Sequence, residues 1–194
     1  MLVAAPLNLS ASPTILVAPF ARTCQSAHVL GKVLRHLDDS SLPLDYRFTE
    51  ALQLSRTTRA LADVLADDPP EIDAETRPSL CTSIAITYSG LLTLYDSYSC
   101  SEKANKPGTE EQLVMQKQGI EGLTEISGRV LELARGVREI VKHGGLDRLS
   151  PMVIDCIYQA AANCKTSRHH TDIIVRADNT IRCMVCPRSL RSNK

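Results

Sequence analysis

Apolar residues return every three or four positions in five separate stretches of the chain, and this spacing constrains the fold more than any other feature. It puts the apolar side chains on one face of an α-helix, whereas a half-buried strand would need alternation. Only 4% of the 194 residues are aromatic and Trp is absent, so the stripes consist mainly of Leu, Ile, Val and Ala. Such side chains suit closely packed helices. The sequence therefore predicts an all-α fold, an irregular bundle of about five helices.

The first two stretches predict a helical hairpin. Pro19 suits a first helical turn, and the residues from Asp38 to Ser41 interrupt the pattern before Pro43 starts the second helix. The first stripe contains Phe20, Cys24, Ala27, Leu30, Leu34 and Leu37. The second contains Leu44, Phe48, Ala51, Leu54, Thr58, Leu61 and Leu65.

A third helix is expected after a stop at Asp67 to Pro70 and an acidic linker to Arg77, because neither Pro69 nor Pro70 fits a helix interior. Pro78 opens it, and a polar, mobile loop over residues 99–108 follows it. Its stripe contains Leu80, Ile84, Tyr88, Leu91, Tyr95 and Tyr98.

A long fourth helix begins at the cap Thr109, with acids in its first turn, and ends at His143, Gly144 and Gly145. Its stripe contains Leu113, Gln116, Ile120, Leu123, Ile126, Val130, Leu133, Val137 and Val141. Inside it lie Gly119, Gly122, Gly128 and Gly136. Each glycine costs about 1 kcal/mol relative to Ala, so these positions suggest close packing or a kink.

Ser150 and Pro151 open a fifth helix, whose expected buried face is Ile154, Ile157, Tyr158 and Ala161. The helical period disappears after Asn163. The chain therefore divides into a loosely ordered lead-in (1–18), a helical domain (19–163) and a basic tail (164–194). Within the tail, β-branched runs at 173–175 and 180–185 leave open a small hairpin or disorder.

Charge is balanced overall but not along the chain. The tail has seven basic and two acidic residues, and the preceding part has 15 basic and 20 acidic ones. Only the tail could attract phosphate, and because it lacks interleaved aromatic residues we do not expect direct binding to nucleic acid. No signal peptide or membrane span is expected, and seven scattered cysteines favour a reducing compartment.

The strongest candidate metal site is the pair Cys183 and Cys186, whose spacing lets both thiolates bind one zinc ion. Cys164, His169 and His170 could supply further ligands. The spacing from His170 to Cys183 is not that of a standard zinc finger, so two unligated thiols are favoured and neither a metal nor a cofactor is predicted.

Cys24, His28 and His36 raise the alternative of a nucleophile with a base on the first helix. No third group that would orient them can be identified, and the sequence has no phosphate-binding loop or catalytic carboxylate pair. Ordinary surface or core placement is favoured, and the sequence predicts no enzyme.

Residues 18–37, APFARTCQSAHVLGKVLRHL, resemble a helix in the regulatory region of fungal zinc-cluster transcription factors. The similarity continues through four further segments. These are Phe48–Leu54, Arg59–Ala62, Leu91–Tyr98 and Leu149–Ala162. It covers about residues 18 to 163, the part that corresponds to the C-terminal portion of the family's helical middle domain.

The resemblance implies a nuclear transcription regulator, or a truncated relative, that controls a metabolic or secondary-metabolite gene set. It implies protein partners in transcription, among them a full-length zinc-cluster factor, and it allows a small-molecule effector. The family binds DNA through a six-cysteine cluster that begins Cys-x2-Cys-x6-Cys, and no three cysteines here have that spacing. No DNA-reading residue is carried over, and the tail looks foreign to the family. The alternatives are a helical scaffold outside transcription and a nonfunctional gene fragment.

Overall fold

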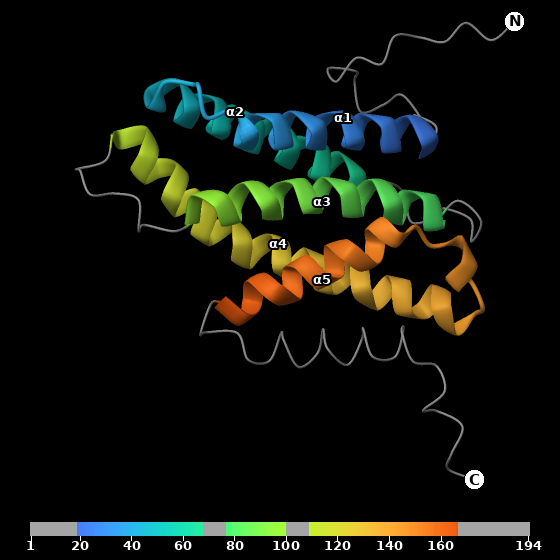
Figure 1. The fold of residues 1–194 in the computed structure, drawn as a ribbon. Coiled ribbons are helices and arrows are strands. Elements are labelled where there is room, and N and C mark those ends of the chain that lie inside the picture. The colour runs from blue at the N-terminus through green and yellow to red at the C-terminus, as the bar shows by residue number, and fades with distance from the viewer. Residues whose placement is uncertain (1–18, 68–76, 100–108, 167–194) are drawn as a thin grey trace, which may run out of the picture.

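The computed structural model describes residues 19–67, 77–99 and 109–166, and every regular element in these ranges is helical (Figure 1). The predicted all-α fold is thereby confirmed. The elements are α1 (Pro19–Asp38), α2 (Leu44–Ala66), α3 (Arg77–Ser99), α4 (Glu110–Lys142), a short 3-10 helix (Leu146–Arg148) and α5 (Pro151–Thr166). None of these helices is both long and apolar enough to cross a bilayer.

α3 is the central helix, with α1 and α2 on one side of it and α4 and α5 on the other (Figure 1). Leu91, Leu92, Leu94 and Tyr95 are completely buried although they point in different directions around its axis. Residues outside the predicted stripe therefore also lie in the core. This burial on several faces is typical of a helix that is surrounded by others.

α1 contacts α3 through a different face from the one predicted. Ser26, Val29, Val33 and His36 are buried, whereas Phe20 of the predicted stripe is 80% exposed. The two helices run parallel, and the Thr87 hydroxyl of α3 donates a 2.9 Å hydrogen bond to Ser26. Thr87 and Tyr98 of α3 are partners for Ser26 and His36, so α1 can bury these two polar residues, which an apolar stripe cannot reveal.

α2 follows its prediction, because Ala51, Leu54, Thr58, Leu61 and Leu65 are all buried. The Thr58 hydroxyl donates to the carbonyl oxygen of Leu54 at 2.7 Å, which satisfies this polar group inside the core. Hydrogen bonds within the connecting turn stabilise the hairpin of α1 and α2. There the Asp39 carboxylate accepts hydrogen bonds from both the backbone N–H and the hydroxyl of Ser41.

α4 begins as predicted, with the Thr109 hydroxyl accepting a hydrogen bond from the Gln112 N–H. The buried face of its first half was predicted wrongly, since Leu113 and Ile120 are exposed. Gly119 and Gly122 face α3 instead. A Cβ atom at Gly122 would overlap the Tyr95 ring, and one at Gly119 would lie 3.1 Å from the Tyr95 carbonyl oxygen. Close packing at these two glycines orients the helix.

α5 is capped as predicted, because the Ser150 hydroxyl accepts a hydrogen bond from the Met152 N–H. Its buried face is rotated from the expected one. Tyr158 is 65% exposed and Ile154 is also exposed, while Val153, Cys156, Ile157 and Ala160 are buried. Compact side chains such as Cys156 and Ala160 let α5 approach α3 and α4 closely. The helix continues past Asn163 to Thr166.

Several predictions fall outside the described residues. They concern the lead-in 1–18, the loop residues 100–108, the hairpin runs in 173–185 and the side chains of Cys164, His169, His170, Cys183 and Cys186.

We expect Gly122→Ala to lower the free energy of unfolding by about 1–3 kcal/mol, because the added methyl group would overlap the Tyr95 ring. Gly136→Ala, in the same helix, is the matched control. A Cβ atom there meets no neighbour, so higher helix propensity should raise stability by up to about 1 kcal/mol. Urea unfolding followed by circular dichroism measures both changes. Equal effects of the two substitutions would contradict the packing described for Gly122.

Candidate functional site

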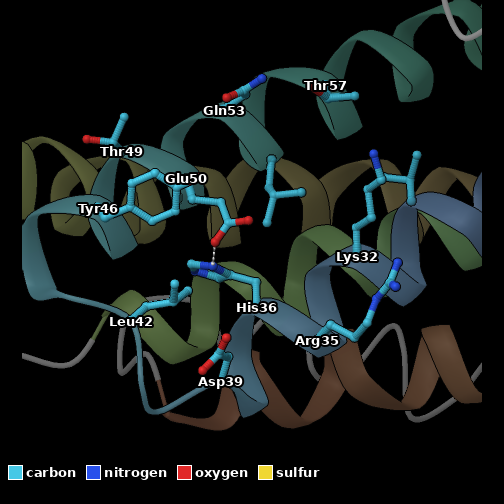
Figure 2. A pocket seen from close by; sticks show the side chains of 12 residues that line it. Lys32, Arg35, His36, Asp39, Leu42, Tyr46, Thr49, Glu50, Gln53 and Thr57 are labelled. Atoms are coloured by element: carbon cyan, nitrogen blue, oxygen red, sulfur yellow. Dashed lines mark hydrogen bonds and ion pairs between the residues drawn. The ribbon is translucent and has the colours of Figure 1, made fainter.

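A pocket of about 520 Å³ opens between α1 and α2, and Figure 2 shows the side chains around it. It lies where the two helices diverge from the turn that joins them. Arg47, at the start of α2, donates a 3.3 Å hydrogen bond to the Leu37 carbonyl oxygen at the end of α1. The hairpin therefore closes one end of the pocket and fixes the spacing of its two walls.

His36 lies at the base of the pocket and is only 3% exposed. Its Nδ1 is 2.7 Å from Glu50 Oε2 on α2, and its Nε2 is 2.8 Å from the Tyr98 hydroxyl oxygen on α3. This chain of hydrogen bonds joins three helices. The Phe48 ring packs edge-on against Tyr98, with ring centroids 5.7 Å apart.

With a neutral imidazole, the electrostatics favour one placement of the protons along the hydrogen bonds from Tyr98 through His36 to Glu50. Burial raises the pKa of the Tyr98 phenol above its ordinary value, although the nearby Arg47 guanidinium acts in the opposite direction. Tyr98 therefore keeps its proton at neutral pH and can donate it to Nε2 of His36. The Nδ1–H of the ring then donates to the Glu50 carboxylate, so both ring nitrogens have partners.

The α1 wall of the pocket is basic. Lys32 and Arg35 are exposed there, and Arg35 Nε donates to the Gly31 carbonyl oxygen of its own helix at 3.2 Å. Asp39, near the turn, is the acidic residue at this end. Its two hydrogen bonds from Ser41 hold the pKa of the carboxyl below its usual value.

The sequence candidates Cys24, His28 and His36 do not form a catalytic set. Only His36 lines the pocket, while His28 is exposed to solvent and Cys24 is half-buried elsewhere on α1. Both nitrogens of His36 already have protein partners. The side chain therefore connects α1 to α2 and α3 at the base of the pocket.

Sequence reasoning missed the partnership of His36 with Glu50 and Tyr98. A weak signal was present, because His36 lies just before the predicted hairpin turn and Glu50 about two helical turns into the second helix, and antiparallel helices bring such side chains together. Nothing in the local sequence points to Tyr98, which is 62 residues away.

A second polar cluster joins α2 to α4 beside Tyr95. Arg59 donates to the Tyr95 hydroxyl at 3.3 Å and to Glu125 at 2.5 Å. Arg129 pairs with Glu125 at 2.9 Å and with Asp63 at 2.7 Å. The hydrogen bond to Tyr95, reinforced by Glu125, raises the pKa of the Arg59 guanidinium above its ordinary value. The groups bond to one another, so we interpret the cluster as structural.

The Cys156 thiol is not chemically activated either. Burial raises the pKa of the Cys156 thiol to about 12, so it remains a thiol at neutral pH. Cys81 is buried as well. Within residues 19–67, 77–99 and 109–166, no three His, Cys, Asp or Glu side chains lie together in a way that could hold a metal ion.

Comparison of the chain with protein-family models, with curated proteins and with solved structures finds no match. The resemblance to zinc-cluster transcription factors therefore stays a prediction.

Tyr98→Phe should lower the free energy of unfolding by about 1–3 kcal/mol, because it leaves a buried His36 nitrogen without its partner. Tyr158→Phe on the surface of α5 is the control and should change stability by less than about 0.5 kcal/mol. Urea unfolding at neutral pH compares the variants. If both behave like the unsubstituted chain, the hydrogen bond between Tyr98 and His36 contributes nothing to stability.

The buried thiol also predicts a loss of stability in alkali. The pKa of Cys156 in the folded chain lies above the ordinary value of 9.0. The stability that the buried neutral thiol contributes is therefore complete below pH 9 and is lost as the pH rises toward 12. Between about pH 8 and pH 10, the free energy of unfolding of Cys156→Ala should therefore fall by about 1 kcal/mol less than that of the unsubstituted chain. Urea unfolding at both pH values measures the two losses, and equal losses would show that the thiol ionises normally. Tyr88 and Tyr98, whose pKa values burial also raises, are common to both proteins.

Proposed function

We propose that this chain is a transcription regulator of the fungal zinc-cluster family, or a truncated relative, that acts through helical contacts with proteins or a small effector and not through catalysis. One observation carries the proposal. The segments that resemble the family fall almost entirely on α1, α2, α3 and α5, which pack around one core. Among the described residues of these segments, Leu149 and Ser150 precede a helix and all others lie within one.

The resembling segment on α3 contains the centre of that core. Leu91, Leu92, Leu94 and Tyr95 all belong to it and are completely buried. Core side chains determine how helices pack, so similarity at these positions supports a shared fold more strongly than similarity on the surface would.

The resembling segment on α1 also contains apolar residues that the core does not use. Phe20 and Leu34 point away from α3 and are largely exposed. Large apolar side chains on a surface can serve protein association, and this supports a role in binding partners. A full-length zinc-cluster factor would supply the DNA contact for which no residues are carried over here, and the expected location is the nucleus.

The experiment compares the location of the tagged chain with transcript levels after deletion of its gene. A nuclear signal and a compact set of altered transcripts, in metabolic or secondary-metabolite genes, are expected. A diffuse cytoplasmic signal with unchanged transcripts would contradict the proposal and leave the helical scaffold or gene fragment as explanations.

Variants connect this phenotype to α1. Phe20→Ser with Leu34→Ser should reproduce the altered transcripts while leaving the helical content unchanged, because both residues are exposed. Leu113→Ser with Ile120→Ser is the matched control. It removes two exposed apolar residues of α4 that lie outside the quoted resembling segments, and should leave transcripts as they are. Equal effects of the two pairs would contradict a specific role for α1.

A further inference from the structure

The pocket between α1 and α2 is lined by two cations, Lys32 and Arg35, and by two carboxylates, Asp39 and Glu50. Lys32 and Arg35 are one helical turn apart on α1, and neither forms an ion pair within the described parts of the chain. The two carboxylates of the pocket already accept hydrogen bonds from the protein, Glu50 from His36 and Asp39 from Ser41. The carboxylates keep their charge, so the place in the pocket that favours an anion is the α1 wall beside Lys32 and Arg35.

Apolar side chains supply part of the pocket's lining, beside the polar ones. Val29 of α1 and Leu54 of α2 are both buried there, and Leu42 of the connecting turn is partly buried. Side chains of this kind favour a hydrocarbon body over a small inorganic ion, because a hydrated ion would gain nothing from contact with them.

Tyr46 provides a flat ring at the rim. It projects from the first turn of α2 and is 59% exposed although it lines the pocket (Figure 2). An exposed phenol ring can stack on an aromatic ligand. Gln53 and Thr57, further along α2, add hydrogen-bonding groups on the wall that faces Lys32 (Figure 2).

We propose that this pocket binds a small aromatic carboxylic acid. Its carboxylate pairs with Lys32 and Arg35, its ring lies over Val29 and Leu54, and Tyr46 covers the outer face. The volume of about 520 Å³ falls within the range of small-molecule sites and accommodates a ligand of one or two fused rings. The inference deepens the proposed function by giving its effector a chemical class, and it rests on that function for its role in the cell.

Two probes of nearly the same shape, one charged and one neutral, separate the contribution of charge to binding from that of shape. Isothermal titration calorimetry with 2-naphthoate and with neutral 2-naphthamide uses the complete purified chain. The acid should bind at least about tenfold more tightly than the amide, and added salt should reduce this difference. Absence of binding by the acid, or equal affinity for both probes, would overturn the proposal.

Substitutions locate the site. Lys32→Gln with Arg35→Gln should weaken 2-naphthoate binding about tenfold or more, and Tyr46→Ala should weaken both probes. The matched control is Lys117→Gln with Arg138→Gln, which removes two exposed cations of α4 outside the pocket and should change affinity by less than about twofold. All substituted residues are exposed, and circular dichroism verifies the fold of each variant. If the first pair behaves like the control, the acid binds elsewhere and the assignment is wrong.

The calorimetry is independent of the cellular experiment. Failure of the acid to bind would remove the ligand and leave nuclear location and transcript changes to decide the regulatory role. Binding by a chain that stays outside the nucleus would keep the pocket assignment and contradict the transcriptional one.

Discussion

Tyr95 holds the packing of three helices together. Its ring lies against Gly122, where any larger residue would collide with it, so α4 approaches α3 without an intervening side chain. Its hydroxyl is 2.9 Å from Ser55 Oγ and also accepts a hydrogen bond from Arg59, both on α2. One buried phenol thus combines a close apolar contact with two polar partners, and a Phe or a Leu at this position could supply only the first. Arg59 also donates to Glu125 on α4, so Tyr95 helps to orient the polar cluster that joins α2 to α4.

The orientation of α3 also determines which face of α1 is buried in the core. Thr87 and Tyr98 lie about three turns apart on α3, and they pair with Ser26 and His36 of α1. These two contacts set the rotation of α1 about its axis. Because Ser26 and His36 face inward, Phe20 and Leu34 face solvent and Lys32 and Arg35 line the pocket. The basic wall is therefore a consequence of polar contacts in the core.

The helices could be predicted from the sequence because their signals are local. Prolines at 19, 43, 78 and 151 and the caps Thr109 and Ser150 depend only on neighbouring residues, and all of them lie at or within two residues of a helix start. The faces were harder to predict. α2 was correct because its apolar stripe is also its buried face, but on α1, α5 and the first half of α4 small or polar residues make the close contacts. Which small residue meets which partner depends on the neighbouring helix. For the same reason His36 was considered only with Cys24 and His28, its neighbours in sequence, and not with Tyr98.

The pocket combines a fixed wall with an adjustable one. α1 is anchored to α3 by buried hydrogen bonds at Ser26 and His36, so the backbone that carries Lys32 and Arg35 is held in place. On the facing wall Tyr46 and Gln53 are exposed, and little packing restricts their rotamers. A ligand held by both walls would stabilise the hairpin relative to the unfolded chain in proportion to its occupancy. Glu50 connects the two walls through His36, and it lies at the pocket surface with a side chain 37% exposed. A bound acid that approached Glu50 would therefore also influence the hydrogen bonds that position α1 on α3.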